Sequence, residues 1–131
     1  MKSDYNVALG FQAMRGISGA TNTGAANVAV GKDAMLGSGA NLTGFWNVAT
    51  GQNALGKIST GQGNTALGLS ALASQTTGDY STGVGDFVMT NGAFQGNTAV
   101  GSGALLNVSG SAGLAFYHTT GCVSGRRKGT E

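Results

Sequence analysis

One short motif recurs six times along this chain of 131 residues, and that repetition constrains the fold more than any other property of the sequence. The copies read NVALG, NVAVG, NVATG, NTALG, STGVG and NTAVG, and they begin at Asn6, Asn27, Asn47, Asn64, Ser81 and Asn97. After each closing glycine, two residues intervene before a second block, which is Ala-Met or Ala-Leu in five copies and Val-Met in the other. The starts are 21, 20, 17, 17 and 16 residues apart, so the chain is expected to stack equivalent coils.

The alternation of residue size within the first block predicts a short β-strand. Larger residues such as Val28 and Val30 flank a small one, Ala29, and this period of two places them on opposite faces of a strand. The closing glycine allows a positive φ, so it is expected at a corner that leads into a second short strand. Residues 1–105 are therefore predicted to form an all-β, parallel β-solenoid of about six two-strand coils. Residues 106–131 break the repeat and are expected to form an atypical C-terminal cap or tail, with a last strand at 114–117.

The composition excludes helical and collagen-like repeats. The chain has 25 glycines and no proline, and hardly any window of a dozen residues lacks a glycine. Each glycine inside a helix costs about 1 kcal/mol relative to alanine. Collagen requires glycine at every third position, whereas the glycines here recur at longer and irregular intervals.

The coils are expected to need partner chains, because each offers few large inward side chains. A core this thin rarely outweighs an ordering cost of about 1.5 kcal/mol per residue. One hypothesis is that a column of small residues forms a flat oligomer interface; its members are Ala8, Ala29, Ala49, Ala66 and Ala99. The alternative is that these alanines fill a narrow interior, since alanine is commonly buried in either setting.

The repeats NVAVGKDAM, NVATGQNAL, NTALGLSAL and NTAVGSGAL resemble the head repeats of trimeric autotransporter adhesins and the related repeats of phage tail fibres. The resemblance covers roughly residues 5–105, with both blocks in register. It implies a left-handed parallel β-roll, a homotrimer with three chains around one axis, and a role in binding surfaces. The spacing of 16–21 residues is more similar to the tail-fibre repeats than to the shorter, more uniform repeats of adhesin heads.

The absence of export and anchor signals in this sequence favours the phage branch of the resemblance. No apolar stretch is long enough for a signal peptide or a membrane span, and a virion protein assembled in the cytoplasm needs neither. We therefore expect a segment of a phage tail fibre that attaches to a host surface glycan or protein, without membrane insertion. The alternatives are a bacterial adhesin head at the cell surface and a structural spacer or self-assembling filament subunit.

The two long spacers between repeats are the candidate ligand-binding segments, because repeat proteins often carry their binding loops there. They run from Arg15 to Ala26 and from Leu36 to Trp46. The candidate ligand contacts within them are Arg15, Asn41, Phe45 and Trp46. Adjacent aromatic rings beside amides and hydroxyls suit stacking on a sugar. The alternative is packing between repeats, since Tyr5, Trp46 and Tyr80 all precede the first residue of a block.

Other function classes find little support in the sequence. Seven Lys and Arg against five Asp and Glu leave a net charge of +2 without a basic stripe, so no nucleic-acid partner is expected. His118 and Cys122 have no established ligand spacing, so no metal site and no cofactor are expected. The few acidic residues form no clear catalytic constellation, and the protein is predicted not to be an enzyme.

Overall fold

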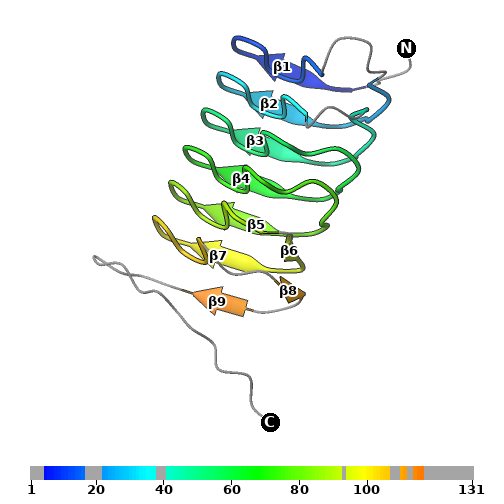
Figure 1. Ribbon diagram of the computed structural model, residues 1–131. Coiled ribbons are helices and arrows are strands. Elements are labelled where there is room, and N and C mark those ends of the chain that lie inside the picture. The colour runs from blue at the N-terminus through cyan, green and yellow to red at the C-terminus, as the bar shows by residue number, and fades with distance from the viewer. Residues whose placement is uncertain are drawn as a thin grey trace.

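The protein is an all-β solenoid of parallel strands that completes about five turns between its first and sixth repeats (Figure 1). The computed structural model describes residues 5–16, 22–37, 41–92, 94–106, 110–111 and 114–116. One sheet carries, in order, β1 (Val7–Leu9), β2 (Val28–Val30), β3 (Val48–Thr50), β4 (Thr65–Leu67), β5 (Thr82–Val84), β7 (Thr98–Val100) and β9 (Leu114–Phe116). A smaller sheet pairs β6 (Phe94–Gln95) with β8 (Gly110–Ser111).

The strand register confirms the alignment of the six repeats and the prediction of a parallel solenoid. Equivalent motif positions pair between adjacent coils, so that Val48 lies opposite Thr65 and Ala49 opposite Ala66. The order of the strands in the large sheet follows the order of the repeats. Beyond the repeats, β9 pairs with β7, which agrees with the last strand expected at 114–117.

The second block of each repeat forms two consecutive turns, and the prediction of a second strand there was wrong. In the coil of β3, the N–H of Ala54 donates to the carbonyl of Gly51 at 3.3 Å, and the N–H of Gly56 donates to Asn53 at 3.1 Å. The third residue of each turn, Asn53 and then Leu55, has a positive φ, as in type II turns. The turns still bond across coils, because Leu55 N–H donates to Ala71 at 3.0 Å.

The closing glycine of each repeat is required by both its dihedral angle and its surroundings. Gly51 has a φ of 131°, and a Cβ built on it would lie 2.3 Å from the carbonyl oxygen of Gly68 in the next coil. The equivalent glycines have similar φ values and the same close contact with the coil below; they are Gly10, Gly31, Gly68 and Gly85. These contacts let successive coils stack at the spacing of a parallel sheet.

The alanine column lies inside the solenoid, which corrects the hypothesis that it forms an oligomer interface. Ala29, Ala49, Ala66 and Ala99 have exposed fractions of 0% within a single chain, so a partner cannot reach them. Ala8 is exposed in the first coil, over which no other described coil packs. The interior also holds larger apolar side chains from the turns and from the third side of each coil, namely Met35, Leu42, Leu55, Ile58, Leu72, Met89 and Phe94. The interior is narrow, and alanine fits where the strand crosses it.

A buried ladder of asparagines fixes the third corner of the coils. The amide oxygen of Asn47 accepts the N–H of Asn64 at 3.0 Å, and the Nδ2 of Asn47 donates to the carbonyl of Gly61 at 2.8 Å. The same pair of contacts joins Asn27 to Asn47 and to Gly44. No buried side-chain nitrogen or oxygen among the described residues lacks a partner. The motif asparagines therefore stabilise the fold from the inside.

Candidate attachment surface

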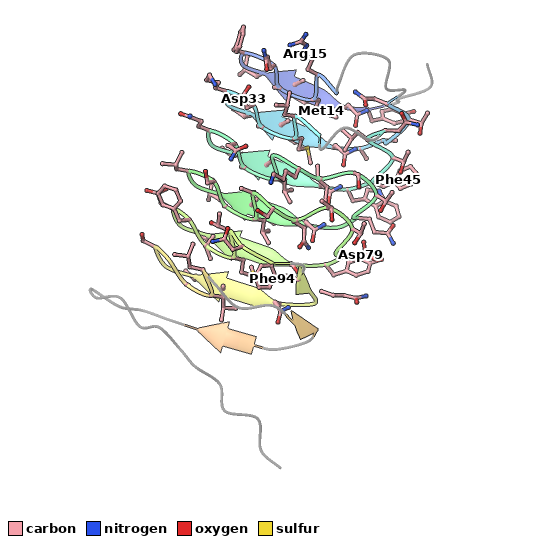
Figure 2. All side chains as sticks on the ribbon, in the orientation of Figure 1. Met14, Arg15, Asp33, Phe45, Asp79 and Phe94 are labelled. Carbon is pink, nitrogen blue, oxygen red and sulfur yellow. The ribbon has the colours of Figure 1, made fainter. Side chains whose placement is uncertain are left out.

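The exposed apolar side chains of the described chain fall mainly into two groups. The first group, which we call the sheet face, consists of the first and third residues of strands β1 to β5 and β7. The second group, the aromatic edge, consists of Tyr5, Phe45, Trp46 and Tyr80, which precede the strands in their coils. Figure 2 shows Phe45 on the same side of the solenoid as Asp79.

The sheet face is apolar or threonine-rich over its whole length, because the strand alternation turns the alanines inward and their neighbours outward. Its most exposed members are Val7, Leu9, Val48, Leu67 and Val100. Two columns of Val, Leu and Thr thus run beside each other, and successive residues within a column are one strand spacing of about 4.8 Å apart. Alternation along a strand does not indicate which of the two faces is buried, so the sheet face could not be identified as a candidate interface from the residues alone.

The aromatic edge includes two of the four residues predicted from the sequence to contact a ligand, Phe45 and Trp46. Trp46 is 64% exposed and Phe45 is also exposed, and their ring centroids lie 6.3 Å apart at an interplanar angle of 53°. The backbone presents Trp46 outward through a positive φ of 57°. Because Tyr5 and Tyr80 are 89% and 59% exposed, the shared position before each block does not bury its aromatic rings in the interior.

The two other candidate contacts lie elsewhere in their coils. Arg15 follows the double turn of the first coil, and Figure 2 shows it near Met14 and away from Phe45. With its carboxamide nitrogen toward Asp33, Gln12 bridges Asp33 Oδ1 at 3.2 Å and Arg15 Nη1 at 3.0 Å. Arg15 therefore belongs to the stacked turns, whereas the exposed Asn41 precedes Leu42 in the second spacer.

The described ends of the long spacers form part of the coil wall. Leu42 is fully buried, and its carbonyl accepts the N–H groups of Thr23 and Gly24 at 3.0 and 2.9 Å. In the same way, Thr43 donates to the carbonyl of Ser59 at 2.8 Å. The segments just before Phe45 are thus held rigidly, which positions the aromatic edge.

The acidic side chains of the described residues support the backbone of neighbouring turns or pair with a lysine. Asp79 accepts the N–H of Gln62 at 2.8 Å, and Asp86 accepts the N–H of Leu69 at 2.9 Å. Asp33 forms an ion pair with Lys32. Within the described ranges, no three His, Cys, Asp or Glu side chains gather to hold a metal ion. His118 and Cys122 lie outside these ranges.

The described part of the chain holds no helix with the length and apolarity that crossing a bilayer requires.

Comparison of the chain with protein-family models, with curated proteins and with solved structures finds no match in any of the three.

Proposed function

We propose that this chain is a non-catalytic structural and attachment segment of a homotrimeric fibre, and that the fibre is a phage tail fibre which binds a glycan or protein on the host surface. The observation that carries the proposal is a regular rod that leaves one apolar sheet face and one aromatic edge exposed along its length. The virion as location and the left-handed coil both follow from the resemblance of the repeats to tail-fibre repeats.

The sheet face supports self-association. Exposed side chains such as Val48, Leu67 and Val100 form part of a continuous strip, and strips of this kind mark interaction sites on soluble proteins. A second copy presents the same strip, and its coils repeat at the same spacing along the axis. Three chains that turn this face toward a common axis would bury the strip and leave each aromatic edge outside.

The aromatic edge supports attachment. A trimer carries three such edges, and weak contacts at each add to a higher overall affinity when a surface offers several ligands. Trp46 and Tyr80 present large ring surfaces at low conformational cost, because the backbone around them is bonded to both neighbouring coils. Asp79 and Gln62, which directly precede Tyr80 and Gly63 in the sequence, add polar groups to this surface.

A purely binding role is supported by the way the acidic groups are used. Glycoside hydrolysis, the reaction most expected of a fibre protein that acts on glycans, needs two carboxyl groups facing one bond. Asp79 and Asp86 instead accept backbone N–H groups of the preceding coil, and Asp33 pairs with Lys32.

Filament formation is a second candidate, favoured by the exposed first coil. Val7, Leu9 and Phe11 there are all more than half exposed. Edge strands of this kind pair readily with another strand, so end-to-end stacking of rods is the competing outcome. Negative-stain microscopy separates short rods of uniform length from long filaments.

Sedimentation velocity tests the trimer. The wild-type protein is expected to sediment as a trimer, and Val48→Glu or Leu67→Glu to shift the mass toward the monomer, because a carboxylate is costly to bury in an apolar contact. Gln52→Glu, an exposed change in a turn, is the matched control. A stable folded wild-type monomer would overturn the proposal.

Binding of the fluorescently labelled trimer to a panel of intact bacterial strains tests attachment. Trp46→Ala should abolish binding to the recognised strains and leave the oligomer intact, while the exposed Phe87→Ala should preserve both. Unchanged binding by Trp46→Ala would remove the aromatic edge from the attachment surface.

A further inference from the structure

The position just before the first block residue alternates between an aromatic and a small side chain through all six repeats. The residues are, in order, Tyr5, Ala26, Trp46, Gly63, Tyr80 and Gly96. The strands themselves repeat in every coil, so this position has a period of two coils where the fold has a period of one. Nothing in the backbone imposes that longer period.

The backbone geometry at this position is the same in every coil. All six residues have a φ between 55° and 66°, including Ala26 and Trp46. Hydrogen bonds connect the position from coil to coil: Trp46 N–H donates to Ala25 at 3.2 Å, Gly63 N–H to Phe45 at 2.9 Å, and Tyr80 N–H to Gln62 at 2.9 Å. The aromatic residues therefore stand two strand spacings apart, which is about 9.5 Å along the solenoid axis.

Gly63 creates room for the ring of Tyr80. Its φ of 66° does not require glycine, because Tyr5 adopts the same angle and Trp46 has a similar one of 57°. A Cβ on Gly63, however, would lie 2.6 Å from Cδ1 and 2.8 Å from Cε1 of Tyr80. The Tyr80 ring thus lies over the glycine and extends along the edge toward the coil of Trp46.

The aromatic rings are exposed and have polar neighbours, as a sugar-binding surface requires. Trp46 and Tyr80 keep more than half of their surface open, although both have apolar faces. Asp79 directly precedes Tyr80 in the sequence. Its Oδ1 accepts the N–H of Gln62 at 2.8 Å, and this hydrogen bond fixes the position of the carboxylate. Thr77 and Gln95, which lie close to Tyr80 and Gly96 in sequence, are exposed as well.

From this spacing we propose that the aromatic edge binds an extended β-1,4-linked polysaccharide that runs parallel to the solenoid axis. In such a chain, successive rings are turned over, so that alternate rings present the same C–H face at an interval comparable to two coils. Alternate sugars stack on Tyr5, Trp46 and Tyr80, and each intervening sugar spans the interval from one aromatic ring to the next. This inference rests on the proposed attachment function and specifies its ligand class.

The probes are β-1,4-linked oligomers of N-acetylglucosamine and of glucose, two to six units long, titrated against the intact protein by calorimetry. Affinity is expected to rise at three units, when two aromatic residues are engaged, and again at five units. α-1,4-linked glucose oligomers, which curl, should bind more weakly. Trp46→Ala and Tyr80→Ala should each weaken the five-unit ligand by roughly fivefold to tenfold.

A variant with the same composition and a different spacing gives the sharpest test. In the double variant Gly63→Tyr with Tyr80→Gly, the aromatic ring moves by one coil, and both substitutions keep a φ already seen at this position. The gain at three units should be lost. Phe87→Ala, which removes an exposed ring at the other end of β5, should change nothing. Circular dichroism and sedimentation verify that each variant is folded.

The outcomes separate the ligand class from the attachment function. Equal affinity of the swapped variant and the wild type, or equal affinity for α- and β-linked chains, overturns the proposed ligand. Attachment to bacteria without affinity for either β-linked series also overturns it, while the attachment function stands. Failure to bind both bacteria and oligosaccharides overturns both.

Discussion

Asn47 and Asn64 are joined inside the solenoid by two hydrogen bonds to one oxygen: Oδ1 of Asn47 accepts the backbone N–H of Asn64 at 3.0 Å and its Nδ2 at 3.1 Å. Both residues are fully buried, and the same arrangement links Asn27 to Asn47. A side chain here replaces a backbone group in the ladder between coils. The first residue of the motif is thus a structural requirement of the corner.

Replacing Asn47 with Ala should lower the free energy of unfolding by about 3 kcal/mol, because it leaves the Asn64 N–H and the Gly61 carbonyl buried without their partner. Urea unfolding followed by circular dichroism measures the change. Gln52→Ala, in the exposed turn of the same coil, should change it little. Equal stability of the two variants would mean that the ladder contributes nothing.

Gly51→Ala should destabilise the protein by about 2 kcal/mol or more, since the new Cβ meets the Gly68 carbonyl and alanine tolerates a φ of 131° poorly. Gly96→Ala is the matched control: its φ of 65° is close to the 55° of Ala26 at the equivalent position, and no atom outside its immediate neighbours lies within 4 Å of the added Cβ. Thermal unfolding of the two variants compares them directly. A similar loss at both positions would contradict the assignment of a special role to the closing glycine.

Ala49→Leu should cost about 1–3 kcal/mol through overpacking of the narrow interior, without a specific effect on oligomeric state. Val48→Leu, one residue earlier and facing outward, should be close to neutral for stability of the single coil. Chemical unfolding and sedimentation together distinguish the two faces. If Ala49→Leu altered the oligomer and not the stability, the alanine column would be an interface after all.

Ile58→Ala should lower the free energy of unfolding by about 2–4 kcal/mol, because this side chain on the third side of its coil is fully buried and its loss leaves a cavity. Lys57→Ala removes an exposed neighbour and should have little effect. The comparison is made by urea titration at constant pH. A negligible change in the free energy of unfolding at Ile58 would indicate that the third side of each coil is not part of the cooperative core.

The parallel stacking could be predicted from the sequence because every coil repeats the same residues at the same positions. The pairing of Ala49 with Ala66 follows directly from aligning the motif copies. Whether the alanine side chains face the interior or the solvent could not be predicted, because alternation shows which residues share a face and not which face is buried. The interior is narrow because the turns after Gly51 reverse the chain within a few residues.

The double turn and the asparagine corner were not predicted from the sequence, for two different reasons. Leu55 and Met35 adopt positive φ values of 48° and 50°, which are uncommon for such residues, so their local preference pointed to a strand. The corner does have a visible signal, a glycine three residues before the motif asparagine, as in Gly44 with Asn47 and Gly61 with Asn64. The carbonyl of that glycine accepts the side-chain amide of the asparagine one coil earlier, as Gly61 does from Asn47 and Gly44 from Asn27. The exposure of Trp46 depends on this corner, and neither residue alone indicates it.

The two periods of this molecule set different rules for how its gene can change length. Each coil contacts only its neighbours, so duplication or deletion of a single repeat leaves a foldable rod. The alternation of Trp46, Gly63 and Tyr80 is kept only when repeats are gained or lost in pairs. Recombination between neighbouring repeats would therefore produce rods that fold but carry their aromatic rings out of phase, whereas exchange over two repeats would lengthen or shorten the edge and keep its spacing.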